Sequence, residues 1–284
     1  MSAETSSDIK PSVISAYEGP FRTVEGALDA GVVLLCDHAR NALPEEYGSL
    51  GLEEAAFGRH IAYDIGAEAL TEALAARLGC PAVLSGFSRL LIDPNRGEDD
   101  PTIVMRLSDG TVVPGNHPIS AEEIRTRIDR FHAPYHRAID DMLDRCQASG
   151  VQPMVFSIHS YTPVWRGVPR PWQAALLWDN DPRLNRFMIA GLRRDPALTV
   201  GDNEPYDGAL KNDTMYRHAT ARGLSQALLE VRQDLIADDC GVQEWADRLA
   251  PLLEQANRRP DMHEIRHYGS RTDGTARKEW THER

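Results

Sequence analysis

The chain has little cysteine and no long hydrophobic run, and each absence excludes a class of protein. Its four cysteines lie far apart and form no C-x-x-C pair, which argues against a structural zinc cluster and a disulfide framework and indicates a reducing compartment. No stretch approaches the roughly 20 apolar residues of a membrane-spanning helix. The polar start, residues 1–19, also lacks the apolar core of a secretory signal. The default expectation is therefore a cytoplasmic protein.

Excess positive charge is missing as well. The 284 residues include 31 Lys and Arg against 43 Asp and Glu, which gives a formal net charge of -12. A surface of this charge repels nucleic acids and anionic membranes, so we expect neither as a partner. The chain has no Gly-rich phosphate-binding loop, which counts against NTPases and dinucleotide enzymes. Ser160 has no G-x-S-x-G context, which argues against a serine hydrolase.

What the sequence does contain is an alternation of short apolar runs and helical patterns. Apolar runs typical of buried strands lie at 32–35, 82–84, 90–92, 153–158, 174–178 and 224–231. Helical periodicity or a capping signal marks 55–78, 120–147, 182–195 and 242–257. Strands that alternate with helices predict an α/β fold, in which a mostly parallel or mixed sheet carries helices on both faces.

The same pattern predicts the domain organisation. Residues 1–12 are small and polar, and we expect them to be disordered. Residues 13–257 contain the apolar runs and form a single predicted domain. Residues 258–284 are a polar C-terminal tail with few core-forming side chains.

Chemically useful side chains stand at or near the ends of four apolar runs. Because parallel strands bring their carboxyl ends to the same rim of a sheet, these side chains are expected to lie together. They are His38 and Asn41, Asn95 and Arg96, His159, and Glu230.

Each of these residues fits a role in a hydrolytic site. His38 could supply an imidazole to zinc and Asn41 a carbonyl oxygen, although both residues could instead cap a helix. The planar fork of Arg96 suits a substrate carboxylate, unless it pairs with Asp93. Glu230 is costly to bury in an apolar run unless it pairs with Arg232 or acts as a general base.

Two further features leave alternatives open. His132 and His136 form an H-x-x-x-H pair that competes as a metal site, but the pair lacks the glutamate of H-E-x-x-H and Pro134 disturbs its helical spacing. The loop from Trp165 to Trp172 either lines a specificity pocket or packs on a neighbour.

Taken together, these motifs resemble the N-formylglutamate amidohydrolase family over about residues 30–255. Each phrase alone is a weak signal, but six of them in this order are fairly specific. The matching phrases are C-D-H-A-R-N (36–41), H-I-A-Y-D-I-G-A (60–67), S-R-L-L-I-D-P-N-R (88–96), I-H-S (158–160), N-E-P-Y (203–206) and E-V-R-Q-D-L (230–235).

The resemblance implies a three-layer fold of the zinc carboxypeptidase type, also described as phosphorylase/hydrolase-like. It implies one zinc ion held by His38, His159 and Asn41, where Asn41 takes the place of the usual carboxylate and Asp37 is the alternative third ligand. It further implies Glu230 as the general base. Asn95 and Arg96 would hold the substrate carboxylate, and Arg89 a second carboxylate or the developing oxyanion.

The sequence-based hypothesis is therefore a zinc-dependent amidohydrolase that removes an N-acyl group, formyl above all, from an acidic amino acid such as N-formyl-L-glutamate. The partner of this enzyme would be its small-molecule substrate. The enzyme would act in amino-acid catabolism, such as histidine degradation. Whether it forms a homo-oligomer is left open. Alternatives are a carboxypeptidase-like or other N-acyl-amino-acid hydrolase, and a non-catalytic carboxylate-binding protein on the same scaffold.

Overall fold

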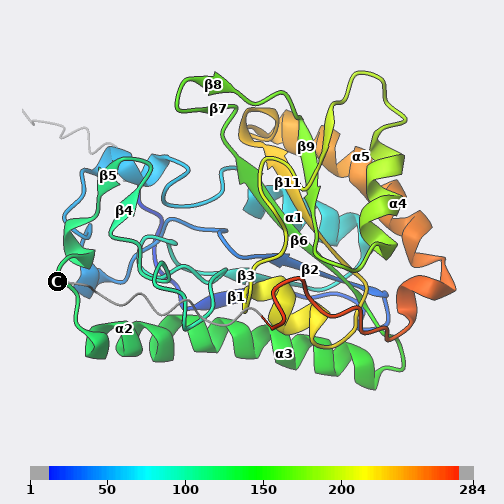
Figure 1. Ribbon diagram of the computed structural model, residues 1–284, viewed down its shortest axis with the longest axis horizontal. Helices are drawn as coiled ribbons and strands as arrows, with labels where there is room; N and C mark the ends of the chain where they lie inside the picture. Colours follow the sequence, from blue (N-terminus) through cyan, green and yellow to red (C-terminus); the bar gives the residue numbers. More distant parts are fainter. Residues whose placement is uncertain (1–12, 275–284) are drawn as a thin grey trace, which may run out of the picture.

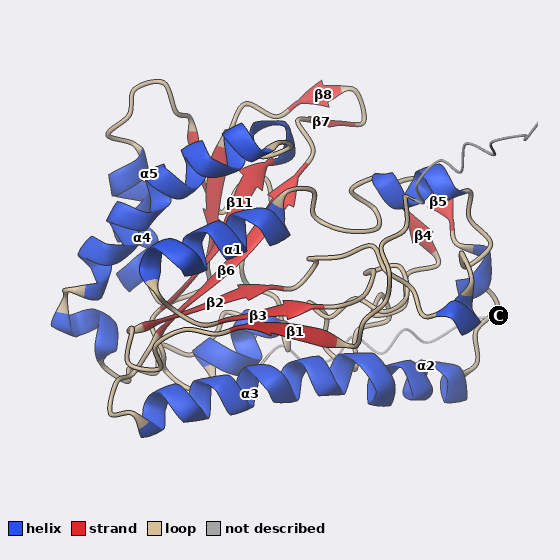
Figure 2. Cartoon of the chain, turned by 180° about the vertical axis from the view of Figure 1, so that it is seen from behind, coloured by secondary structure: helices blue, strands red, loops and turns tan. Residues whose placement is uncertain are grey.

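The computed structural model describes residues 13–274, so the expected disorder of residues 1–12 lies outside the described part. A seven-stranded sheet forms the middle layer of three (Figures 1 and 2). In order across the sheet, its strands are β1 (Phe21–Val24), β3 (Ala82–Ser85), β2 (Val32–Cys36), β6 (Met154–Tyr161), β11 (Gln226–Arg232), β9 (Ala174–Leu177) and β10 (Val200–Asp202).

The sheet is mixed, with a parallel centre. Strands β3, β2, β6 and β11 run parallel to one another. β1 is antiparallel to β3, β9 is antiparallel to β11, and β10 is parallel to β9. The predicted three-layer α/β fold with a mostly parallel or mixed sheet is therefore confirmed.

Helices cover both faces of the sheet. Figure 2 shows α1 (Ala67–Leu78), α4 (Arg183–Leu192) and α5 (Asp239–Asn257) on one face, and α2 (Ala121–Arg127) and α3 (Ala133–Ala148) on the other. The all-apolar strand β2 contacts both layers, because its alternate side chains point to opposite faces. Val32 and Leu34 pack in the core under α1 and α5, whereas Val33 and Leu35 pack in the core over α3.

The helix predicted over 120–147 is confirmed as a nearly continuous rod. The Ser120 side chain accepts a hydrogen bond from the Glu123 backbone N–H at 3.0 Å and so caps α2. A π-helical turn, Ile128–His132, joins α2 to α3. Pro134 lies in the first turn of α3, where a missing backbone N–H does little harm.

Two predicted elements differ from the structure. Residues 90–92 are buried but form a turn rather than a strand, since an apolar run alone does not distinguish the two. The helix predicted from residue 55 begins only at Ala67, because Gly66 has a φ of 80° and breaks the helical path. A side chain at Gly66 would also clash with the backbone oxygen of Ile236 at 2.1 Å, so the turn before α1 requires glycine.

Two small two-stranded hairpins lie outside the main sheet, β7–β8 at the top and β4–β5 at the left of Figure 1. They are β4 (Leu107–Ser108) with β5 (Thr111–Val112), and β7 (Val164–Trp165) with β8 (Val168–Pro169). The remaining short helical turns are Glu45–Tyr47, Glu54–Gly58, Pro114–Asn116, Tyr216–Thr220, Gln233–Leu235 and Pro260–His263. No helix within residues 13–274 has the length and apolar character needed to cross a membrane.

Candidate active site

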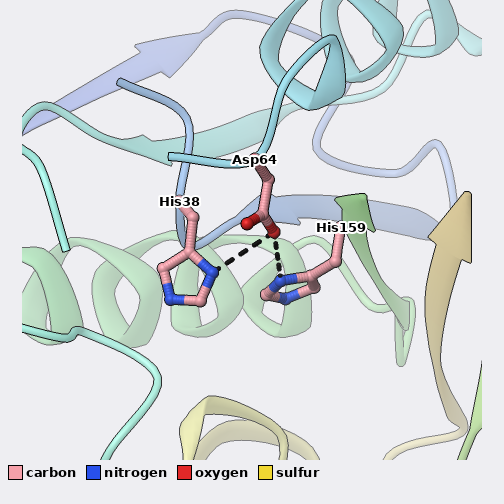
Figure 3. Close-up of side chains that lie close together, drawn as sticks. All are labelled: His38, Asp64 and His159. Atoms are coloured by element: carbon pink, nitrogen blue, oxygen red, sulfur yellow. Dashed lines mark hydrogen bonds and ion pairs between the residues drawn. The ribbon is translucent and has the colours of Figure 1, made fainter. Parts of the chain in front are cut away.

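Three buried side chains converge beyond the central strands (Figure 3). His38 follows β2, Asp64 lies in the turn before α1, and His159 stands in β6 near its carboxyl end. The Asp64 Oδ2 atom lies 3.2 Å from His38 Nδ1 and 2.9 Å from His159 Nδ1. Two imidazole nitrogens and a carboxylate oxygen therefore face one point.

This donor set fits a divalent metal ion. Zinc bound at about 2.0–2.1 Å in tetrahedral geometry holds its ligand atoms about 3.3 Å apart, which is close to the two distances at Asp64. Two histidines and one carboxylate also leave a fourth position open, as catalytic zinc sites do. Among the described residues this is the one group of three or more His, Cys, Asp or Glu side chains whose ligand atoms, one from each residue, all lie within 4.8 Å of one another.

The second ring nitrogen of each histidine faces another buried carboxylate. His38 Nε2 lies 2.8 Å from Asp93 Oδ1, and His159 Nε2 lies 3.0 Å from Asp37 Oδ2. Carboxylates in this position fix the ring orientation of metal-binding histidines and leave the other nitrogen for the metal. Asp37, the alternative third ligand, thus lies behind the ring of His159 and orients it.

The charges of these carboxylates are stabilised by their neighbours. Burial opposes the charge of Asp64, but His38 and His159 outweigh it and hold the pKa of Asp64 below its usual range. Burial likewise opposes the charge of Asp93, but the Arg89 guanidinium and His38 hold its pKa well below the usual range. Both groups are therefore anionic across the physiological pH range.

The structure places Asp64, and not Asn41, beside His38 and His159, so Asp64 is the better-placed candidate for the third ligand. The Asn41 Nδ2 donates to the carbonyls of Val13 and Phe57 at 2.9 and 2.7 Å, and its Oδ1 accepts from the Ser15 N–H at 3.0 Å. Both the nitrogen and the oxygen of this amide are therefore engaged in hydrogen bonds to backbone groups. The family phrase at 60–67 contains Asp64, but no strand pattern precedes this residue, so the local pattern does not mark it as a site residue.

The other predicted site residues share one cavity with the metal-ligand group. The cavity has a volume of about 390 Å³. Its lining includes His38, Asp64 and His159, together with Arg89, Asn95, Arg96 and Glu230. The topology thus brings together all of the predicted residues except Asn41.

Glu230 stands beside the His38–Asp64–His159 group, and its carboxylate has no hydrogen-bond partner among residues 13–274. In the parallel pairing of β11 with β6 it lies opposite His159. It is 8% exposed, and its Oε2 is buried without a hydrogen bond. Arg232 pairs with Asp234 instead, at 2.8 Å. Burial raises the pKa of Glu230 to about 7, which suits a group that accepts a proton near neutral pH.

The two arginines that line the cavity, Arg89 and Arg96, differ in how closely they contact carboxylates. Arg89 donates to Asp93 Oδ2 at 2.7 Å and lies 3.6 Å from Asp64 Oδ1. Within the described residues, the one ion pair of Arg96 is with Asp100 at 4.0 Å, the longest distance that counts as an ion pair. The alternative expectation, an ion pair of Arg96 with Asp93, is not seen there. Asn95 accepts a hydrogen bond from the Thr214 N–H at 3.2 Å, which leaves its amide NH₂ as a donor.

His132 and His136 hold the segment that carries Asn95 and Arg96, and neither belongs to the one candidate metal-binding group found within residues 13–274. His132 Nε2 lies 2.9 Å from the Arg96 carbonyl, and His136 Nε2 lies 3.0 Å from the Pro94 carbonyl. A carbonyl oxygen only accepts, so both histidines donate from Nε2. His136 Nδ1 in turn lies 2.7 Å from His218 Nε2. The cluster therefore fixes the backbone on both sides of Asn95.

Comparisons with known proteins identify a matching family and similar folds. A sequence profile described as N-formylglutamate amidohydrolase matches residues 30–237. The crystal structure of a gene product from Agrobacterium tumefaciens is 33% identical, with a TM-score of 0.79 over 83% of this chain and 94% of that chain. An N-formylglutamate amidohydrolase from Ralstonia eutropha is 21% identical, with a TM-score of 0.66 over 84% and 97%, and shows the same fold. The comparison with curated proteins gives no significant match.

Proposed function

The chain belongs to the N-formylglutamate amidohydrolase family and is a hydrolase of amide bonds, and we propose that it is a metal-dependent amidohydrolase of N-acyl amino acids. One observation carries this proposal: the His38–Asp64–His159 group and the Glu230 carboxylate line the same cavity, and that carboxylate has no hydrogen-bond partner among residues 13–274. Through the family, N-formyl-L-glutamate is the first substrate to test.

The proposed mechanism assigns a task to each residue. His38, Asp64 and His159 would hold one divalent metal ion, zinc by the chemistry of the donor set. When bound, such an ion supplies Lewis acidity that polarises an amide carbonyl and lowers the pKa of water toward about 7. Glu230 accepts a proton from the attacking water and delivers it to the nitrogen of the leaving amine. Asp37 and Asp93 keep the two imidazoles in place.

The side of the cavity that carries Asn95, Arg96 and Arg89 would orient the substrate. The Arg96 guanidinium and the Asn95 amide would hold the substrate carboxylate. Arg89, held close to the ligand group by Asp93, is placed to stabilise the developing oxyanion. A cytoplasmic location, expected from the composition, and a role in amino-acid catabolism such as histidine degradation, expected through the family, belong to this proposal, and a homo-oligomer is left open.

Metal content and turnover together test the proposal. We expect about one zinc per chain by elemental analysis of protein purified without chelator, and hydrolysis of an N-formyl amino acid that chelator stops and added zinc restores. Zinc without turnover of any N-acyl amino acid would contradict the amidohydrolase assignment. Turnover that is indifferent to chelation, in protein shown to be metal-free, would contradict the metal.

The role of Arg96 gives a separate prediction. Arg96→Gln is expected to raise KM about 10–100-fold with little change in kcat, because a charged hydrogen bond to the substrate carboxylate is lost. Steady-state kinetics measure the split. Arg106→Gln is the matched control, since Arg106 is exposed and does not line the cavity. An unchanged KM in Arg96→Gln would place the carboxylate elsewhere.

A further inference from the structure

A single buried guanidinium organises one wall of the cavity. The Arg170 Cζ lies 5.4, 5.2 and 5.1 Å from the ring centroids of Tyr161, Trp165 and Tyr206. Arg170 is 8% exposed and has no carboxylate partner among the described residues. A desolvated cation attracts aromatic rings strongly, so Arg170 holds the three rings as one unit, here called the aromatic wall.

The aromatic wall is part of the cavity surface. Its three residues line the cavity, whereas Arg170 lies behind them and is not in the lining. They come from the end of β6, from β7 and from the loop after β10, so the wall joins three separate segments. The Tyr161 hydroxyl donates to the Trp172 carbonyl at 2.5 Å and is not available to a ligand.

Aliphatic side chains extend this surface. Met105, Leu177, Leu210 and Leu228 also line the cavity. The cavity lining therefore contains an apolar surface made of aromatic and aliphatic side chains. Apolar area of this kind favours a ligand that carries an apolar group of its own.

The charges in the cavity favour a substrate with one carboxylate. Arg89 and Arg96 are the only cationic Arg or Lys side chains in the described lining, and Arg89 is already bound to Asp93. Arg96 therefore remains for a single carboxylate. A second carboxylate would find no unpaired arginine in the described lining.

We propose that the substrate is an N-acyl amino acid with one carboxylate, held by Arg96, and a bulky apolar group that lies against the aromatic wall. This inference rests on the proposed function and narrows its substrate class. The reaction is unchanged: the water oxygen bonds to the acyl carbon, the C–N bond breaks, and the amine leaves with the proton from Glu230. The apolar group is either the amino-acid side chain or the acyl group.

A matched substrate series distinguishes these two sources. For the zinc-loaded protein we expect kcat/KM at least about tenfold higher for N-formyl-L-phenylalanine or for N-benzoylglycine than for N-formyl-L-glutamate. A preference for the first assigns the apolar group to the side chain, and a preference for the second assigns it to the acyl group. A preference for N-formyl-L-glutamate would overturn the inference and leave the proposed function standing.

Variants of the wall provide the second test. Trp165→Ala is expected to lower kcat/KM about tenfold for the preferred apolar substrate and to leave N-formylglycine, which has no side chain, nearly unchanged. Val168→Ala is the matched control on the same hairpin, because Val168 is 66% exposed and does not line the cavity. An equal loss for both substrates, or none, would contradict a role of the wall in specificity.

Binding separates this inference from the proposed function. Calorimetric titration of the Glu230→Gln protein with N-formyl-L-phenylalanine, N-benzoylglycine and N-formyl-L-glutamate requires no turnover. Tighter binding of one of the apolar ligands would support the inference even if the wild-type protein hydrolysed none of them, in which case the proposed function alone would fail. Tighter binding of N-formyl-L-glutamate would overturn the inference.

Discussion

Replacing Asp64 with Asn is expected to lower zinc affinity at least about a hundredfold and to abolish hydrolysis. Even residues that only orient a metal ligand cost 10–100-fold when they are removed, and Asp64 would be a ligand itself. An amide oxygen is neutral and a weak donor to zinc, so the substitution preserves the shape of the side chain and removes its charge. Zinc per chain after gel filtration, measured by elemental analysis, gives the direct readout.

Asn41→Ala is the matched control, because the sequence motif placed the third ligand there. Its side chain holds three backbone groups, so the variant is expected to lose about 1–3 kcal/mol of unfolding free energy while it keeps its zinc. Circular dichroism melting measures the first effect and elemental analysis the second. The opposite pattern, with zinc lost in Asn41→Ala and kept in Asp64→Asn, would restore Asn41 as the ligand.

Three of the residues predicted from sequence, His38, His159 and Glu230, stand in or just after strands. His38 and Glu230 could be placed at one rim because buried apolar runs reveal parallel strands, and parallel strands align their ends. The same reasoning predicts the position of His159, which lies opposite Glu230 in the sheet. Local pattern and one topological rule were enough for these three side chains.

Asp64 could not be predicted in this way, because its position depends on tertiary packing. Helical periodicity suggested a helix from residue 55, whereas Gly66 breaks the path and sets a turn against the Ile236 carbonyl. That turn directs Asp64 to the histidines. No local period in the sequence encodes such a contact between distant segments.

The segment that carries Asn95 and Arg96 shows a different outcome. The strand expected at 90–92 is absent, yet Asn95 and Arg96 reach the cavity. Asp93 is held by His38 and Arg89, and the carbonyls around Asn95 are held by His132 and His136. The residue identities were thus more informative than the element assigned to them.

Glu230→Gln is expected to lower kcat by about 10²–10⁴-fold and to leave zinc content unchanged, since the variant loses proton transfer but not a metal ligand. The same variant should be more stable than the wild-type protein at alkaline pH. Burial raises the pKa of Glu230 from 4.5 to about 7, so the folded state binds this proton more tightly than the unfolded state does.

The sign of the pH dependence follows from that difference. The stabilisation that the bound proton provides is complete below pH 4.5 and is lost as the pH rises through about 7, where the wild-type protein must hold a buried charge. The glutamine side chain of the variant stays neutral at every pH. In metal-free protein, the unfolding free energy of the variant relative to wild type should therefore rise between about pH 5 and pH 8, by up to about 3 kcal/mol.

Denaturant unfolding in the presence of chelator measures this trend without the attraction of a bound cation for the carboxylate. Glu25→Gln is the control, because Glu25 is exposed and its substitution should give a flat difference across the same pH range. Any cost of an unpaired amide at residue 230 is equal at every pH and cancels from the slope. A difference that falls as the pH rises would mean that Glu230 is stabilised in its charged form, which would contradict a proton acceptor with a raised pKa.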